Sequence, residues 1–193
     1  GVGGREEDYN SIGSDWSNRR WATLSKNVKT MQSVWSKELH PNLGPSTFSN
    51  GGPKILAGAV GPKAMEMSAN FAEGLAGFSF NADIEEIKDS FYRVNEAFKK
   101  NNKTPRLVTS FWFGLGESAR SDIQIHLERY LSWMGDDLAK DLAKTAGFSG
   151  NQADLKEFLS LIKAAGATDV LLVPTSKNIE QLILAEEVIA QFS

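Results

Sequence analysis

Short apolar runs alternate with segments of helical periodicity along most of this sequence, and this alternation constrains the fold more than any other feature. Four runs are apolar almost throughout, at residues 55–57, 75–80, 107–113 and 169–173. Strands that are apolar on both faces must be covered on both faces, and strands joined through helices form parallel sheets. The sequence therefore predicts an α/β fold with a parallel sheet and right-handed crossovers.

Apolar residues recur every three or four positions in the segments between these runs, which is the period of an amphipathic helix. Helices are predicted over residues 17–35, 62–72, 84–99, 118–145, 155–166 and 178–192. The fourth of these carries a possible break at Gly135. Asp83 with Glu86, and Asn178 with Gln181, have the spacing of residues that cap a helix start.

The length and composition limit the possible functions. At 193 residues the chain is predicted to form a single domain over residues 1–193. Lys and Arg number 21 against 24 Asp and Glu, and a net charge of −3 argues against nucleic acid as a partner. With no Cys and only two His, disulfides, Cys-ligated zinc and iron–sulfur clusters are excluded, and no metal site is predicted. No run approaches the ~20 apolar residues of a membrane span, so we expect a cytoplasmic protein without a membrane partner.

Two glycine-bearing junctions join a predicted strand to a predicted helix, and either could hold a phosphate. Residues 114–119 read GLGESA and match a dinucleotide-binding fingerprint in form. That fingerprint also needs a second strand that ends in an acidic residue about 20 positions further on. Residues 120–147 look helical instead, and Asp136 and Asp137 lie within or between helices. This junction is therefore interpreted as an ordinary strand-to-helix turn.

The other junction reads GAVGPK over residues 58–63. Small residues let a ligand approach the backbone, and the first N–H groups of a helix favour an anion. Lys63 could add a positive charge, and Arg19 or Arg20 could converge on the same anion. The alternatives are a purely structural turn at residues 58–63 and a pair of solvated arginines. His40, in a long loop, is a candidate substrate contact, whereas His126 is expected to be a surface or partner-bonded residue.

Three passages resemble the luciferase-like flavin monooxygenases, a family that includes bacterial luciferase and the coenzyme F420-dependent oxidoreductases. Residues 53–74 resemble the fifth strand and helix of that family, residues 1–20 the end of its fourth strand and the helix that follows, and residues 165–174 its final helix-to-strand passage. Departures from the pattern are Lys26, where many relatives have Glu, and Glu73, where they have Asp.

The resemblance implies a fold and a partial coverage of it. The family has a (β/α)8 TIM barrel, a fold of typically ~250 residues. The four predicted strands would be about strands 5–8, so that the chain would be the C-terminal portion of a luciferase-like barrel. The start at Gly1 rather than Met suggests a fragment or a processed product, with a cloning remnant as the alternative. The segment at residues 114–151 resembles the variable insertion of the family, for which a lid role is possible.

Carried over position by position, the resemblance also implies a cofactor site. The flavin phosphate would lie against Ala59, Val60 and Gly61, with Lys63 close by. Gly4 would approach the phosphate or the ribityl chain, and Arg20 would be the cationic contact. Catalytic residues are not predicted. In this family the residues that shape the isoalloxazine and substrate pocket come largely from the early strands, which this chain would lack.

The implied function is that of a flavin-dependent oxidoreductase or monooxygenase that uses FMN, reduced FMN or F420 and acts on a small-molecule substrate. One alternative is a shortened, non-catalytic flavin-binding protein, since reduced relatives of luciferase that lost part of the barrel are known in this family. Another is a half-barrel that works only after association with the missing half or with a second copy, because open strand edges and an apolar inner face invite pairing. Dimers are the default in the family, so a homodimer is expected.

Overall fold

The computed structural model describes residues 6–18, 21–42, 52–59 and 61–192. Its Cα positions cluster into two compact units. The first unit comprises Gly1–Gly74 and Val94–Pro105, and the second comprises Leu75–Arg93 and Arg106–Ser193. The single domain over residues 1–193 stays a prediction.

The first unit is mainly helical. Its elements are α1 (Glu6–Ser11), η1 (Trp16–Asn18), α2 (Trp21–Trp35), β1 (Leu56–Ala57), α3 (Pro62–Ser68) and the last residues of α4 (Ile84–Lys99). The predicted helix at residues 17–35 corresponds to η1 and α2. Its apolar stripe is only partly covered, because Val28 is buried while Met31 is 42% exposed.

Both elements of the predicted strand-to-helix passage in the first unit are shorter than expected. β1 has two residues, and α3 ends at Ser68 instead of continuing to residue 72. The Ser68 hydroxyl donates to the Ala64 carbonyl at 2.7 Å, and the Phe71 N–H donates to the Ser68 carbonyl at 3.0 Å. Such local hydrogen bonds compete with continuation of a helix. The Glu73 N–H then donates to the Ile55 carbonyl at 2.8 Å, which fixes the chain after α3 beside the residue that precedes β1.

The second unit contains the larger part of the sheet and the helices that cover it. Its elements are β2 (Gly74–Ala76, with Gly74 in the first unit), the start of α4, β3 (Arg106–Leu115), α5 (Ala119–Tyr130), η2 (Ser132–Met134), α6 (Asp136–Ala143), β4 (Phe148–Gly150), α7 (Gln152–Ala164), β5 (Asp169–Pro174), α8 (Glu180–Ile189) and η3 (Ala190–Phe192).

β3 is the strand around which the second unit is built. It pairs in parallel with β5, from Val108 opposite Asp169 to Phe113 opposite Pro174, and also in parallel with the short β4. Just after β2, the Gly77 N–H donates to the Val108 carbonyl at 2.8 Å. The parallel sheet predicted from the apolar runs is confirmed.

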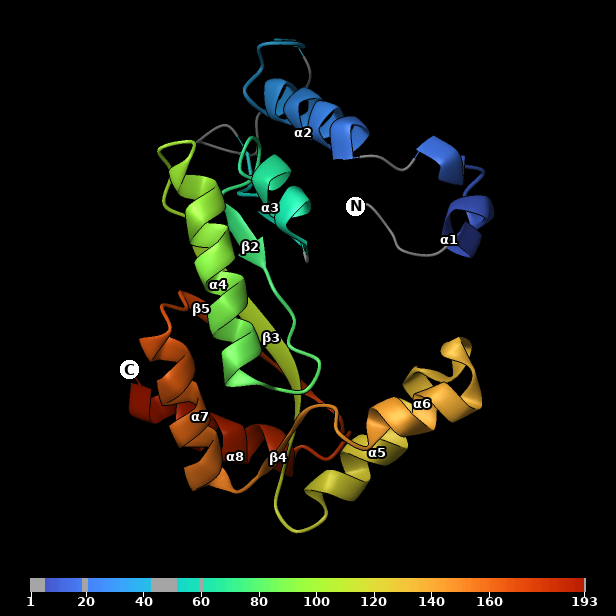
Figure 1. Ribbon diagram of the computed structural model, residues 1–193, viewed down its shortest axis with the longest axis vertical. Helices are drawn as coiled ribbons and strands as arrows, with labels where there is room; N and C mark the ends of the chain where they lie inside the picture. Colours follow the sequence, from blue (N-terminus) through green and yellow to red (C-terminus); the bar gives the residue numbers. More distant parts are fainter. Residues whose placement is uncertain (1–5, 19–20, 43–51, 60, 193) are drawn as a thin grey trace. The chain divides into compact units, whose positions relative to one another are not determined.

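Alternate side chains of β3 face different helices. Phe111 makes ring contacts with Phe158 of α7 at 5.1 Å between centroids. Trp112, its neighbour in sequence, belongs to a buried cluster with Ile123 and Leu127 of α5. Figure 1 shows α5 and α6 on one side of β3 and α7 and α8 on the other. The near-continuous apolar run of β3 is thus explained by helices on both faces.

Between residues 114 and 151 the structure divides the predicted helix at the possible break and adds one strand. The helical segment predicted for residues 118–145 is divided into α5, η2 and α6. The possible break at Gly135 is confirmed, and Gly135 has a φ of +101°. β4 was not predicted, because Phe148, Ser149 and Gly150 are too few to show a period of two.

The predicted caps are half correct. The Asp83 carboxylate accepts from the Glu86 N–H at 3.3 Å, but the Glu86 carboxylate accepts from the Ser79 hydroxyl at 2.8 Å instead of returning to Asp83. Similarly, Asn178 accepts from the Glu180 N–H at 3.0 Å, but Gln181 does not take part in this cap. A complete capping box occurs at Asn151 and Asp154, which had not been singled out.

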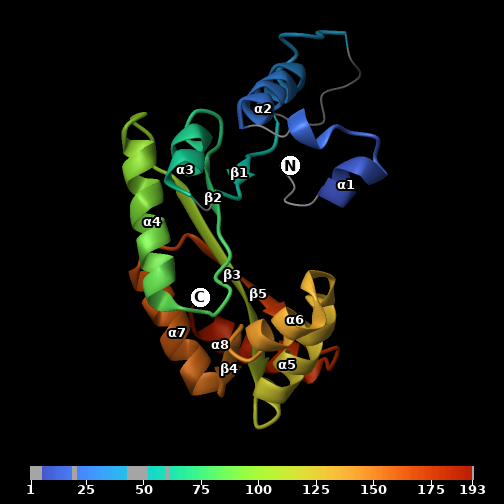
Figure 2. The ribbon, with the colours of Figure 1, turned by 45° about the vertical axis from the view of Figure 1, so that its right-hand side comes forward.

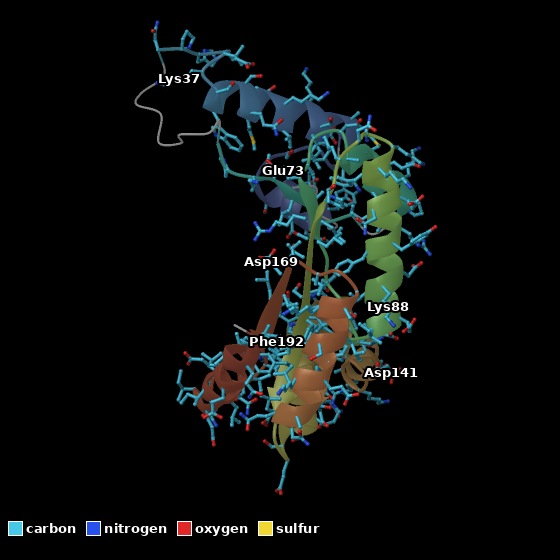
Figure 3. The ribbon with its side chains drawn as sticks, turned by 90° about the vertical axis from the view of Figure 1, so that its left-hand side faces the viewer. Lys37, Glu73, Lys88, Asp141, Asp169 and Phe192 are labelled. Atoms are coloured by element: carbon cyan, nitrogen blue, oxygen red, sulfur yellow. The ribbon has the colours of Figure 1, made fainter. Side chains whose placement is uncertain are left out.

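β5 is less buried than its apolar sequence predicts. Leu171 is 58% exposed, and the remaining residues of the strand are only half-buried. Figure 2 shows β5 beside β3, and no other described strand pairs with it. At the start of β5, Asp169 forms a two-point ion pair with Arg106 of β3, with distances of 2.7 and 2.6 Å. Figure 3 labels Asp169 at this end of the strand. No helix within the described residues is long and apolar enough to cross a membrane.

Candidate functional site

The structure describes three of the six residues predicted to hold a cofactor. Ala59, Gly61 and Lys63 lie in the passage from β1 to α3. Gly4, Val60 and Arg20, together with Arg19, fall outside the described residues. The β1–α3 junction is therefore the part of the predicted cofactor site that the structure describes.

Gly61 is the position of this junction that is open to a ligand. It is the N-cap of α3, with φ −97° and ψ 157°, and Pro62 follows at the first helical position. Among the described residues, a Cβ added to Gly61 would meet no atom within 4 Å outside its chain neighbours. Ala59 differs, because it is only 5% exposed and packs into the protein. Of these two residues, Gly61 offers the accessible backbone.

The first turn of α3 leaves two backbone donors near Gly61. The Met65 N–H donates to the Gly61 carbonyl at 3.0 Å, and Pro62 has no N–H. Helix geometry therefore leaves the N–H groups of Lys63 and Ala64 without an intrahelical carbonyl. The Lys63 side chain is exposed and forms no ion pair with any described residue. Two amides and one ammonium group are a donor set that suits the oxygens of an anion.

At the junction after β3, in contrast, several backbone amides are already hydrogen-bonded within the protein. The Leu115 N–H donates to Gln181 Oε1 at 2.7 Å, and the Leu115 carbonyl accepts from Gln181 Nε2 at 2.9 Å. The N–H of Gly116 donates to the Gly150 carbonyl, and that of Ala119 to the Gly116 carbonyl, at 3.0 and 3.1 Å. The amides of Leu115, Gly116 and Ala119 thus already have protein partners and are not available to a phosphate. The interpretation as an ordinary turn fits the structure.

Gln181 is a residue that the sequence reasoning assigned wrongly. It was predicted to cap α8, but its amide is 8% exposed and holds both backbone groups of Leu115 at the end of β3. A buried amide is retained where it completes hydrogen bonds that would otherwise be lost. The available signal was its place among apolar residues, between Ile179 and Leu182.

A chain of ring contacts lies on the side of β3 that α5 covers, and it was also missed. Trp112 contacts Phe78 at 4.6 Å, Phe80 at 5.2 Å and Tyr130 at 6.0 Å, each in an edge-to-face arrangement. His126 stacks on Tyr130 at 6.2 Å. Phe78 and Tyr130 are exposed at the two ends of this aromatic cluster. Their rings offer flat apolar contacts near the carboxyl ends of β2 and β3.

His126 has the ring partner expected of it. Partial burial, followed by the charge of Arg129, lowers the pKa of the His126 imidazole below its usual value. The ring is therefore neutral at pH 7, which suits its stacking on Tyr130. His40, the other histidine, is exposed in the turn after α2. Among the described residues, His, Asp and Glu side chains form no group of three or more that could hold a metal ion.

The segment from α5 to β4 is anchored by a buried core as well as by hydrogen bonds. Leu127 and Leu131 are buried with Ala143 of α6 in the cluster around Trp112. Arg120 of α5 donates to the carbonyls of Lys144 and Ala146 at 3.0 and 2.5 Å, just beyond the end of α6. The lid role of this segment stays a prediction, and any lid movement would have to carry α5 and α6 together.

The sequence and the fold can be compared with those of known proteins. No protein-family model matches the sequence, and a search of curated proteins likewise finds no match. Solved structures do match. An F420-dependent secondary alcohol dehydrogenase in complex with an F420-acetone adduct matches 90% of this chain, with a TM-score of 0.62 at 13% identity. Monooxygenase RslO1 from Streptomyces bottropensis matches 100% of it, with a TM-score of 0.69 at 16% identity, and apo-MsnO8 matches 98%, with a TM-score of 0.64 at 14% identity.

The chain shares the fold of these proteins. The match spans 62% of the dehydrogenase, 67% of RslO1 and 65% of MsnO8, so this chain accounts for about two thirds of their length. At these identities the likeness concerns the fold. It agrees with the α/β architecture and the parallel sheet expected from the sequence.

Proposed function

We propose that this chain is the phosphate-binding part of a flavin- or F420-dependent oxidoreductase or monooxygenase with a luciferase-like barrel, corresponding to about strands 5–8 of that barrel. Its cofactor is FMN or F420, and its substrate is a small molecule. The observation that carries the proposal is the open backbone at Gly61, at the start of a helix, in a chain that shares its fold with an F420-dependent dehydrogenase and a monooxygenase.

The residues at the β1–α3 junction fit a phosphate group. Gly61 leaves space where any other residue would place a Cβ, and the Lys63 and Ala64 amides lack intrahelical acceptors. The Lys63 ammonium adds one charge. Because α3 has only seven residues, its dipole contributes little, and the direct hydrogen bonds matter more. Val60, Gly4 and Arg20 complete the proposed site.

The protein and the cofactor have separate roles in this proposal. The bound flavin or F420 supplies hydride transfer, which no protein side chain provides. The β1–α3 junction binds and orients the phosphate end. The exposed rings of Phe78 and Tyr130, both in contact with the buried Trp112, would offer apolar contacts to the substrate or to a flat ring system.

Titration of the intact protein with FMN and with F420, followed by flavin fluorescence or calorimetry, tests the proposal. Gly61→Asp places a carboxylate where the phosphate would lie, so we expect at least a tenfold loss of affinity, or about 1.4 kcal/mol. Lys63→Ala and Arg20→Ala should each weaken binding several-fold through loss of a charge-assisted contact. Lys156→Ala, which removes an exposed lysine from α7, is the matched control and should have no effect.

The cofactor proposal fails if neither FMN nor F420 binds to the intact protein. The site assignment fails if either binds but Gly61→Asp and Lys63→Ala leave the affinity unchanged. Gly61→Ala separates charge from bulk, because a methyl group adds volume at the same place without adding a negative charge.

The non-catalytic alternative uses the same site. A shortened flavin-binding protein would bind cofactor with the same dependence on Gly61 but would not turn over substrate. Rapid oxidation of NADH, or F420-linked oxidation of an alcohol, by the 193-residue chain alone would exclude this alternative.

The exposed β5 edge favours a second candidate, namely function through association. Leu171 is 58% exposed on β5, and Ile179, Leu182 and Ile183 are exposed at and just before the start of α8. Apolar residues at a strand edge invite pairing with another strand. The chain would then act with the remaining part of a barrel or as a homodimer, and its 62% share of the dehydrogenase structure agrees with the first possibility.

Sedimentation over a range of protein concentrations tests this candidate. We expect a dimer, or a tendency to self-associate, that Leu171→Lys weakens at least tenfold. Leu161→Lys on α7, also an exposed leucine, is the matched control and should leave association unchanged. A monomer at every concentration with a cooperative melt would contradict self-association.

A further inference from the structure

A second candidate binding site lies in the first unit, apart from the β1–α3 junction. It is a groove with a volume of about 640 Å³ between α2 and α3, which pack against each other (Figure 1). That volume is within the ~300–1,000 Å³ of small-molecule sites. The residues that line it are Ala22, Ser25, Lys26, Lys29, Thr30, Ser33, Leu39 and Met67.

The groove carries positive charge that forms no ion pair within the part of the chain that the structure describes. Lys26 and Lys29 line it, and neither forms an ion pair with a described residue. The residues that line the groove include no Asp or Glu, and α2 itself carries no carboxylate. Glu66, the residue before Met67, is held by an ion pair with Lys100. In a chain with a net charge of −3, this is a local concentration of unbalanced positive charge.

Hydroxyl groups on the same helix can add hydrogen bonds to these charges. Ser25, Lys29 and Ser33 follow one another at intervals of four, which places them on one face of α2. The Ser25 and Ser33 hydroxyls have no hydrogen-bond partner in the described part of the chain and remain free to donate. Thr30 differs, because its hydroxyl donates to the Lys26 carbonyl at 3.1 Å. Two ammonium groups and two hydroxyls are therefore available in one groove.

The apolar part of the groove is held in place by the end of α2. Lys37 has a φ of +64°, and the Leu39 N–H donates back to the Ser33 carbonyl at 3.1 Å. This left-handed turn closes the helix and carries Leu39 to the groove. Figure 3 labels Lys37 at this turn. Leu39, Met67 and Ala22 supply apolar contacts beside the charged groups.

We propose that this groove binds a small organic phosphate monoester, with the phosphate against Lys26 and Lys29 and the apolar body against Leu39 and Met67. A phosphate monoester carries about −1.5 to −2 charges at pH 7, which matches two ammonium groups better than a single carboxylate does. Its oxygens accept from the Ser25 and Ser33 hydroxyls. This site is separate from the flavin proposal and does not depend on it.

The test is a titration of the ¹⁵N-labelled protein with phenyl phosphate, followed by amide chemical shifts. We expect saturable shifts at millimolar concentration, concentrated in residues 22–33 and at Met67. Inorganic phosphate should bind more weakly because it lacks the apolar body, and benzoate more weakly because it carries one charge. Added salt should weaken all three anions, since the charges are exposed.

Substitutions separate the contribution of the lysine charges to the affinity from that of the apolar contact. Lys26→Ala with Lys29→Ala should reduce the affinity for phenyl phosphate at least tenfold, and the double Arg variant should retain it. Lys156→Ala with Lys177→Ala removes the same charge from exposed positions of the second unit and should change little. Met67→Asn should weaken phenyl phosphate but not inorganic phosphate.

Two results would overturn the proposal. One is the absence of saturable shifts in residues 22–33, and the other is an equal loss of binding in the two double alanine variants, which would indicate unspecific attraction to lysines. Gly61→Asp should leave phenyl phosphate binding at the groove unchanged while it removes flavin binding, so failure of one site is distinguishable from failure of the other.

Discussion

Two strand-to-helix junctions in this protein have similar sequences but opposite states. Residues 114–119 match a dinucleotide-binding fingerprint in form, yet the amides of Leu115, Gly116 and Ala119 are bonded to Gln181, Gly150 and Gly116. Residues 58–63 match no strict fingerprint, yet Gly61 has open space beside it and the first amides of α3 lack intrahelical partners. Phosphate binding depends on free donors, which a local sequence does not reveal when a distant residue can occupy them.

Removing the distant residue has the largest expected effect on this comparison. Gln181→Met keeps the length of the side chain but leaves the N–H and the carbonyl of Leu115 without their partner. An unsatisfied buried group costs ~1–3 kcal/mol, so we expect a loss of about 2–4 kcal/mol in the free energy of unfolding. Urea denaturation followed by circular dichroism measures the change.

Gln191→Met is the matched control for this variant. Gln191 donates to the Glu187 carbonyl at 3.0 Å but is exposed, so its replacement should cost less than ~0.5 kcal/mol. Equal losses in the two variants would show that the β3 junction is not held closed by Gln181.

The glycines of the two junctions give the second test. A Cβ at Gly114 would lie 3.1 Å from the Ala119 carbonyl oxygen and 3.3 Å from the Ala119 Cα, whereas a Cβ at Gly61 would meet no atom of the described part of the chain within 4 Å. We expect Gly114→Ala to lower the melting temperature by the equivalent of about 1–3 kcal/mol, and Gly61→Ala to change it by less than about 0.5 kcal/mol. If the two variants have the same melting temperature, the two glycines do not differ in the space available for a Cβ.

The ion pair between Arg106 and Asp169, at the start of β3, is expected to have the smallest effect on stability. There, Arg106 chiefly lowers the pKa of the Asp169 carboxyl to about 2, from an ordinary value of 3.8. A depressed carboxyl pKa adds stability that is present above about pH 4 and is lost as the pH falls towards 2. Because both side chains are partly exposed to solvent, the ion pair should contribute only a small part of the stability.

Acid unfolding of the Arg106→Gln variant measures this contribution. The variant should be slightly less stable at pH 7, and its stability should fall less steeply between about pH 4 and 2 than that of the wild type. An acid transition identical to that of the wild type would show that the ion pair adds nothing. If Arg106→Gln lowered the free energy of unfolding as much as Gln181→Met does, this would contradict the prediction that the buried hydrogen bonds of Gln181 contribute more than the exposed ion pair.

The sequence predicted the elements whose signals are local and periodic. α4 and β3 are examples, because a helical apolar stripe and a seven-residue apolar run each contain their own evidence. The three-residue β4 and the end of α3 at Ser68 were missed, because each depends on one or two residues. Short elements are defined mainly by their neighbours in space.

The features of the candidate site likewise include some that the sequence indicated and some that it did not. Gly61 was predicted as a binding position from small residues before a helix, and its role stays a prediction, while a Cβ there would meet no described atom within 4 Å. Gln181 and the rings around Trp112 were not predicted as features of the fold, because their partners lie far away in the sequence. The groove between α2 and α3 was invisible for a further reason: the lysines of α2 look solvated until Leu39 and Met67 are placed beside them.

The parallel pairing of β3 with β5 also has a consequence for synthesis. Arg106 and Asp169 are 63 residues apart, so β3 leaves the ribosome well before the strand it needs. At ~5–20 residues per second, this highly apolar segment waits roughly 3–13 s for its partner. During that interval α5 and α6 emerge and can cover the Trp112 side, while the Phe111 side depends on α7. Nascent chains of this protein should therefore engage chaperones between the emergence of β3 and that of α7.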